Sequence, residues 1–146
     1  MSGAVWVAVV AGALCLLAVL VGALWLSRTR ALTRRVGSFG CLLGDAEGGP
    51  CARGVAQYGA VTLYWWRRMS IMPRPARTWS RQGISVLERM PLPLVPGRPP
   101  AVVARCRVTS AGTGSVTEVR LQMSADAYAG FTSWLEATPS RVGSVI

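Results

Sequence analysis

The residues from Ala4 to Leu26 form an uninterrupted run of 23 positions without a charged side chain. As a helix rising about 1.5 Å per residue, this run is about 34 Å long, enough to cross a hydrocarbon core of about 30 Å. Trp6 and Trp25 would lie about 28 Å apart along its axis, so both indoles fall near the membrane interfaces. A cleaved secretory signal has a shorter apolar core behind a basic segment. The run therefore predicts a membrane anchor over residues 1–27.

Four arginines follow the apolar run within eight positions, whereas no charged residue precedes it. They are Arg28, Arg30, Arg34 and Arg35. Positively charged flanks of a span stay on the cytosolic side of the membrane. We therefore expect a single-pass protein of the cell (inner) membrane, with the N-terminus outside and the following domain in the cytoplasm. Residues 28–35 are expected to be a basic juxtamembrane linker, which would also attract an anionic leaflet.

Residues 36–138 are expected to form one β-rich domain that ends in a helix. Ser124 is a suitable N-cap for a helix beginning at Ala125, and Pro139 stops it. Residues 139–146 are expected to be a flexible tail. Alternating apolar positions between glycine- and proline-rich turns predict strands over residues 37–43, 52–58, 60–67, 84–89, 102–109 and 116–123.

The order of these elements predicts a small antiparallel β barrel or sandwich with a C-terminal amphipathic helix. This is the layout of pleckstrin-homology-like domains, although a split sandwich with a packed helix fits nearly as well. The strand over residues 60–67 is apolar on both faces and is expected to be central or covered. Near the end of the chain, Arg105 and Arg107 could pair with Glu118 across the outer faces of the last two strands.

The segment over residues 64–81 combines five arginines with tryptophan, tyrosine, methionine and isoleucine. Arginine can neutralise phosphates while the apolar side chains enter a headgroup layer or a partner surface. One interpretation is therefore a loop that binds lipid or a partner. The residues expected to carry this binding are Arg67, Arg68, Arg74, Arg77, Arg81, Trp66 and Trp79. The other interpretation is that Trp65, Trp79 and Ile71 are core residues of two strands and that the arginines only solvate the connection.

Other chemistries have less support in the sequence. The chain has no histidine and no lysine, so serine lacks its usual activating bases and we identify no catalytic residue. Cys41, Cys51 and Cys106 include no CxxC pair, so we expect no metal site and no cofactor. With reversed topology, a disulfide between Cys41 and Cys51 would become plausible. Residues 36–146 have 12 arginines and 6 acidic residues, and this net charge of +6 permits nucleic-acid binding, but the membrane anchor argues against it.

Several segments together carry a family resemblance. They are the apolar anchor with its arginines, Gly37-Ser38-Phe39, Arg53-Gly54-Val55, Trp79-Ser80-Arg81 and Gly130-Phe131-Thr132-Ser133-Trp134-Leu135-Glu136-Ala137. Over nearly the whole chain, these segments resemble an actinobacterial membrane family catalogued as domain of unknown function 2550. The chain departs from the family at Cys51-Ala52, where a tryptophan is expected beside the basic residue. The resemblance implies an actinobacterial source and genes often encoded beside those of ATP synthase, but it implies no activity.

The sequence therefore predicts a non-enzymatic, single-pass membrane protein with a cytosolic binding or scaffold domain, acting as an accessory to a membrane complex. The alternative is a peripheral module that senses anionic lipid through the basic and aromatic loop over residues 64–81. Nucleic-acid binding and catalysis are the least favoured functions.

Overall fold

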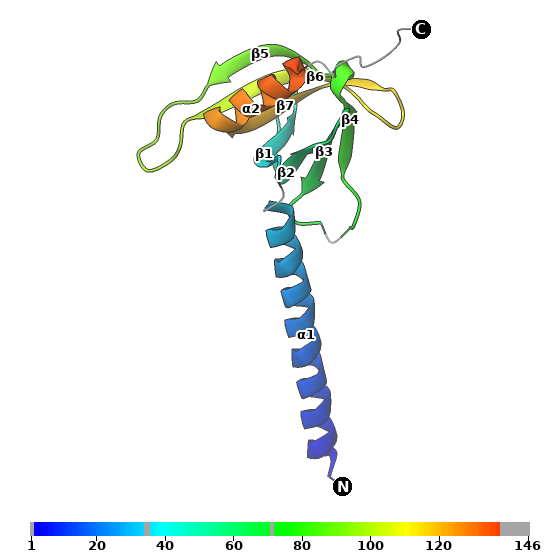
Figure 1. The fold of residues 1–146 in the computed structure, drawn as a ribbon. Helices are drawn as coiled ribbons and strands as arrows, with labels where there is room; N and C mark the ends of the chain where they lie inside the picture. The colour runs from blue at the N-terminus through cyan, green and yellow to red at the C-terminus, as the bar shows by residue number, and fades with distance from the viewer. Residues whose placement is uncertain (1, 34–35, 71, 138–146) are drawn as a thin grey trace. The chain divides into compact units, whose positions relative to one another are not determined.

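A computed structural model describes residues 2–33, 36–70 and 72–137, and the chain divides into two compact units, Met1–Arg35 and Val36–Ile146 (Figure 1). The first unit is one helix, α1 (Gly3–Thr33). Within it, Gly3–Ser27 is long and apolar enough to cross a membrane, and none of this segment is buried in the structure. The helix continues beyond the apolar run to Thr33. Residues 28–33, which were expected to be part of a linker, are therefore helical.

The second unit contains an antiparallel sheet of seven strands followed by a helix (Figure 1). Six strands match the predicted ranges to within two residues at each end. The seventh, β4, was not among the predicted strands. The elements are β1 (Ser38–Asp45), β2 (Ala52–Tyr58), β3 (Thr62–Arg67), β4 (Arg77–Ser80), the 3-10 helix η1 (Arg81–Gly83), β5 (Ser85–Pro91), β6 (Ala101–Thr109), β7 (Val116–Ser124) and α2 (Ala125–Glu136).

The sheet has the strand order β4-β3-β2-β1-β7-β6-β5. It bends so that the edge strand β4 meets the end of β6. There Trp79 forms an isolated bridge with Ser110, and the amide of Ala111 donates to the carbonyl oxygen of Thr78 at 3.0 Å. The sheet is nevertheless not closed into a barrel. The likeness to pleckstrin-homology-like domains stays a prediction.

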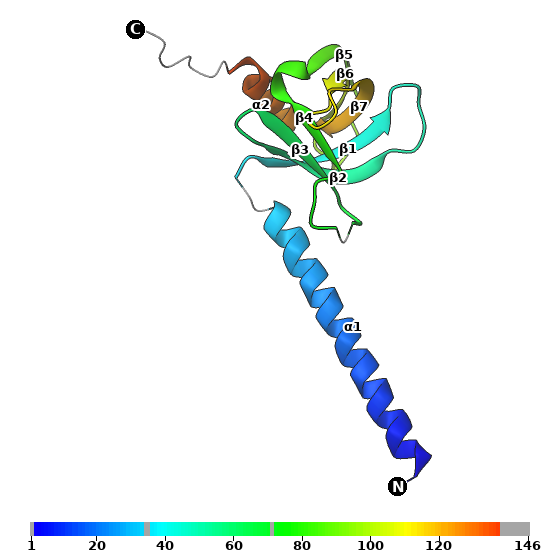
Figure 2. The same ribbon diagram turned by 90° about the vertical axis from the view of Figure 1, so that its right-hand side faces the viewer.

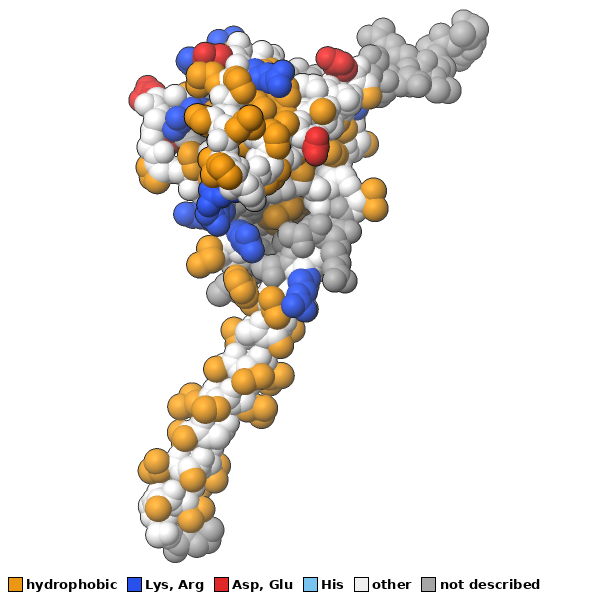
Figure 3. Space-filling view, turned by 90° about the vertical axis from the view of Figure 1, so that its left-hand side faces the viewer, with side chains coloured by type: hydrophobic (Ala, Val, Ile, Leu, Met, Phe, Trp, Pro, Cys, Tyr) orange, Lys and Arg blue, Asp and Glu red, His pale blue; other side chains and the backbone are white. Residues whose placement is uncertain are grey.

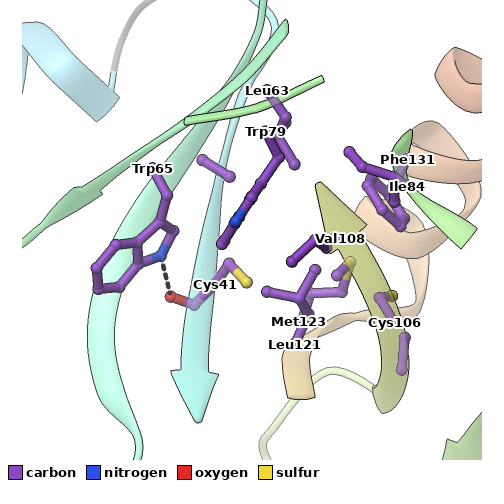
Figure 4. Packing of buried hydrophobic residues seen from close by; sticks show 12 residues of the cluster. Cys41, Leu63, Trp65, Trp79, Ile84, Cys106, Val108, Leu121, Met123 and Phe131 are labelled. Carbon is purple, nitrogen blue, oxygen red and sulfur yellow. Dashed lines mark hydrogen bonds between the residues drawn. The ribbon is translucent and has the colours of Figure 1, made fainter. Parts of the chain in front are cut away.

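The core lies on one face of the sheet, under α2. Along β6 every second residue is buried, as the alternation predicted. Phe131 of α2 is fully buried against this face. The indole of Trp65 is also buried, and its Nε1 donates to the carbonyl oxygen of Cys41 at 3.4 Å (Figure 4). Because every residue of the core lies between positions 41 and 131, the second unit has a hydrophobic core of its own.

The C-terminal helix begins as predicted. The hydroxyl oxygen of Ser124 accepts a hydrogen bond from the amide of Ala127 at 3.1 Å. At the other end of the helix, the indole of Trp134 donates to the carbonyl oxygen of Gly59 at 3.0 Å. The predicted stop at Pro139 lies outside the described residues.

The predicted pairing across the outer face of the last hairpin is confirmed. The guanidinium of Arg105 lies 2.6 Å from a carboxylate oxygen of Glu118, and that of Arg107 lies 3.3 Å from the other oxygen. These contacts lower the pKa of Glu118, first through the hydrogen bonds from Arg105 and Arg107. Exposed pairs of this kind contribute little to stability.

Candidate binding surface

The loop between β3 and β4, residues 68–76, carries the centre of the predicted basic segment. Two backbone hydrogen bonds hold its ends: the amide of Arg68 donates to the carbonyl oxygen of Arg53 at 2.9 Å, and the amide of Ala76 donates to that of Trp65 at 2.8 Å. The loop projects beyond the ends of β3 and β4 (Figure 2). Side chains on it and beside it are therefore displayed at the rim of the sheet.

Five exposed arginines gather on and around this loop, and we call them the basic surface. They are Arg53, Arg67, Arg68, Arg74 and Arg77. None of them forms an ion pair with a carboxylate within the described part of the chain; the ion pairs there join Arg105 and Arg107 to Glu118. The basic surface therefore keeps its full charge available for an anion from outside the domain.

The backbones of two members of the basic surface face each other where β2 and β3 reach this loop: Arg53 lies in β2, and Arg68 directly follows β3. The hydrogen bond between the backbones of Arg68 and Arg53 extends the pairing of β2 with β3 by one residue beyond Gly54 and Arg67. Opposite residues of an antiparallel pair share a face, and like charges in this position destabilise the sheet. Violations of local stability rules are expected at functional sites.

A shallow hollow of about 470 Å³ lies within the basic surface. Its lining includes the side chains of Arg53, Arg67, Met69 and Ser70. Met69 is 78% exposed, and Met72 on the same loop is 72% exposed. Positive charge and flexible apolar side chains are thus presented together, a mixture that fits the interface between water and lipid.

Two predicted binding residues have structural roles instead. Trp79 is only 3% exposed and packs in the core beside Trp65, so its ring cannot contact a lipid or a partner. The guanidinium of Arg81 lies 5.1 Å from the ring of Trp134 and donates to the carbonyl oxygen of Ala60 at 3.3 Å. Arg81 therefore helps to hold α2 against the turn between β2 and β3 and is not part of the basic surface.

For the segment over residues 64–81, the structure confirms the structural interpretation of two tryptophans, and the binding interpretation stays a prediction. Trp65 and Trp79 are core residues of two strands, as the structural interpretation required. Trp66 is half-buried on the other face of β3, where its ring lies 5.7 Å from that of Tyr64. Ile71 lies outside the described residues. The arginines at 67, 68, 74 and 77 are exposed at the rim, which both interpretations required.

Arg53 is the member of the basic surface that the sequence did not predict. It precedes the basic segment by more than ten positions and lies in β2, whose alternation gave no sign of a functional residue. Only the register between β2 and β3 brings it opposite Arg68.

The juxtamembrane arginines belong to the first unit. Arg28 and Arg30 lie in the last turns of α1, and Arg30 is exposed. Arg34 and Arg35 lie outside the described residues. The role of these four residues in membrane topology stays a prediction.

The cysteines of the sheet unit are free thiols. Cys41 and Cys106 are buried, and this burial raises the pKa of each thiol to about 12. Cys51 is exposed and lies opposite Gly44. Because Cys41 shares the inner face with Leu43, Cys51 and Cys41 lie on opposite faces of the sheet. The disulfide considered for a reversed topology would therefore require the backbone to rearrange.

The described residues contain no group of three or more cysteine, aspartate or glutamate side chains that could hold a metal ion. The aromatic cluster under α2 also offers no reactive group. Within it, burial raises the pKa of Tyr58 to about 12, while the ring packs 5.1 Å from Phe39 and 5.3 Å from Trp134. The basic surface is therefore the feature that most needs a functional explanation.

A family model described as "Protein of unknown function (DUF2550)" matches residues 14–141. The chain belongs to this family. The match includes most of the apolar segment and the whole of the sheet and α2, and it confirms the resemblance carried by the sequence segments. No curated protein matches the sequence. Since the description of DUF2550 assigns no activity, the function has to be argued from the surface of this chain.

Proposed function

We propose that this protein is a non-enzymatic, membrane-anchored binding protein whose sheet unit contacts the anionic surface of its own membrane through the basic surface. The observation that carries the proposal is the pair Arg53 and Arg68, whose backbones are hydrogen-bonded to each other and whose exposed side chains form no ion pair with a carboxylate of the described residues. An arrangement that costs the free domain stability is explained if an external anion occupies it.

The strength of such a contact follows from membrane electrostatics. Each basic side chain near an anionic leaflet contributes about 1 kcal/mol, so five arginines supply on the order of 5 kcal/mol at low ionic strength. This attraction decays within a Debye length of about 8–10 Å at physiological salt. Met69 and Met72, both largely exposed, add apolar surface that can enter the headgroup layer.

The chain length between anchor and sheet favours the membrane as the partner. From Ser27 to Thr33 the chain is helical and advances about 9 Å, and the five steps from Thr33 to Ser38 span at most about 18 Å. The start of the sheet therefore stays within about 27 Å of the end of the apolar segment. A nine-residue strand is about 30 Å long, so the surfaces of the unit are within reach of the headgroups.

The proposal includes the predicted orientation, with the N-terminus outside and the sheet unit on the cytoplasmic side of the cell membrane. The arginines after the apolar run support this orientation, and anionic lipid is concentrated in the cytoplasmic leaflet. The second candidate is an acidic surface of another protein, in an accessory role at a membrane complex. Arginine and methionine are enriched at protein interfaces as well as at membranes.

The exposed thiol of Cys51 provides the assay. In a Cys15→Ala background, a spin label attaches to Cys51, because the thiols of Cys41 and Cys106 are buried and protonated. The full chain is placed in nanodiscs of phosphatidylcholine alone or with phosphatidylglycerol. We expect the label to be shielded from a water-soluble nickel chelate only when phosphatidylglycerol is present, and the shielding to disappear in 1 M salt.

Two double variants separate the basic surface from net charge. Arg53→Gln/Arg68→Gln should abolish the shielding, whereas Arg105→Gln/Arg107→Gln, which removes the same charge elsewhere on the sheet, should leave it in place. Equal loss in both variants, or no dependence on phosphatidylglycerol, contradicts the proposal. If lipid has no effect but a membrane protein is captured by the parent chain and not by Arg53→Gln/Arg68→Gln, the acidic protein partner is the correct function.

A further inference from the structure

The hairpin loop between β5 and β6, residues 92–100, is fixed at its base. The amide of Leu92 donates to the carbonyl oxygen of Ala101 at 2.9 Å and closes the hairpin. The carbonyl oxygen of Pro100 accepts from the amide of Ala125 at 2.9 Å, which ties the loop to the start of α2. The loop is therefore held both to its own strands and to the helix that covers the core.

The tip of this loop is a tight turn. The amide of Arg98 donates to the carbonyl oxygen of Val95 at 3.1 Å, with Pro96 and Gly97 between them. Gly97 has a φ of +77°, which is the conformation that a type II turn requires at its third residue, and proline favours the second. Five prolines within residues 91–100 further limit its freedom. The tip is thus ordered before any partner arrives, so binding costs it little conformational entropy.

This ordered tip presents apolar side chains to solvent. Leu94 is 79% exposed and Val95 is 51% exposed, and Met90 at the end of β5 is exposed as well. No acidic residue occurs between Glu88 and Glu118 in the sequence. In Figure 3, which faces the side from which this hairpin projects in Figure 1, hydrophobic side chains form a broad exposed area on the sheet unit.

The neighbouring hairpin tip between β6 and β7 provides a contrast within the same unit. Residues 110–115 are serine, alanine, glycine and threonine, and the amides of Ser110 and Gly114 are bonded within the tip. It is exposed to solvent but presents no large apolar side chain. A hairpin tip that projects into solvent therefore does not need large apolar side chains, and those of the β5–β6 tip require another explanation.

We propose that the tip of the β5–β6 hairpin inserts Leu94 and Val95 into the lipid of the membrane that α1 crosses. This extends the proposed function, because it gives the sheet unit an apolar contact with the same bilayer in addition to the electrostatic one. The chain between Ser27 and Ser38 keeps the start of the sheet within about 27 Å of the end of the apolar segment, so the unit stays near this one membrane. Aliphatic side chains on a stiff loop, with Arg98 positioned to remain among the headgroups, match the polarity gradient of that interface.

Depth measurements on the full chain test this proposal. In a Cys15→Ala/Cys51→Ala background, the substitutions Leu94→Cys, Val95→Cys and, as the matched control, Gly112→Cys each place one spin label at an exposed tip. A side chain at Gly112 would meet no atom within 4 Å, so the control label should not disturb the fold. The three proteins are placed in nanodiscs of phosphatidylcholine with phosphatidylglycerol, and collisions with oxygen and with a water-soluble nickel chelate are compared by power saturation.

We expect labels at positions 94 and 95 to have an oxygen-to-nickel collision ratio several-fold above that at position 112. If both labels match the control, the tip lies in water and the proposal is overturned. The same result is expected if the natural partner of the tip is a protein, because the nanodiscs contain no partner protein. The readout is separate from that of the basic surface. Insertion that persists with Arg53→Gln/Arg68→Gln supports the apolar contact even if the electrostatic one fails. A lipid-dependent label at Cys51 combined with a solvent-exposed tip leaves the proposed function intact without this contact.

Discussion

Replacing Arg53 by glutamine should make the sheet unit more stable while weakening its binding. The backbone of Arg53 in β2 is hydrogen-bonded to that of Arg68, the residue after β3, and no described carboxylate pairs with either side chain. Removing one of two neighbouring like charges should relieve repulsion of the size measured for exposed charge pairs, about 0.2–1 kcal/mol. For a domain of about 100 residues, this corresponds to a rise in Tm of roughly 1–6 °C. If Arg53 instead stabilised the fold, its replacement by glutamine would lower the Tm.

The measurement uses a fragment beginning at Val36, because all core residues lie within the second unit. Thermal unfolding is followed by circular dichroism at 20 mM and at 1 M salt. At 1 M salt the Debye length falls to about 3 Å, so the gain should shrink. Arg74→Gln is the matched control: it removes the same charge from the loop between β3 and β4, where no strand residue lies opposite it, and should not gain stability. A lower Tm for Arg53→Gln at low salt would refute the argument that this pair is strained.

The remaining predictions concern the packing and the thiols of the sheet unit. Phe131→Ala, which empties a fully buried position under α2, should lower the free energy of unfolding by about 3–5 kcal/mol, measured by urea denaturation. Gly54→Ala should also destabilise the fold, because its Cβ would lie 2.4 Å from the Trp65 ring and 2.5 Å from the carbonyl oxygen of Trp66; an unchanged urea midpoint would contradict the packing described. In the native fragment only Cys51 should react with a thiol reagent at pH 8. Burial raises the pKa of Cys41 and Cys106 to about 12, so the contribution of these two thiols to stability should be constant below about pH 8.5 and fall as pH rises from there towards 12. This fall should be smaller in Cys106→Ala.

Local patterns in the sequence were sufficient for the elements whose signal lies within a few residues. The uncharged run set the length of the apolar helix segment, the period of two in β6 identified its buried face, and the hydroxyl of Ser124 defined the start of α2. Each depends on spacing along one stretch of chain, which is the information that a sequence contains directly.

The composition of the binding surface was decided by strand pairing. Arg53 and Arg68 are 15 positions apart and become neighbours only through the register of β2 and β3, while the bend of the sheet places Trp79 beside Ser110 and buries it. The sequence showed that arginine and tryptophan were mixed between residues 64 and 81. Only the tertiary structure determined that the tryptophans at 65 and 79 fill the core and that the arginines remain at the rim, because burial depends on what the other strands place against each face.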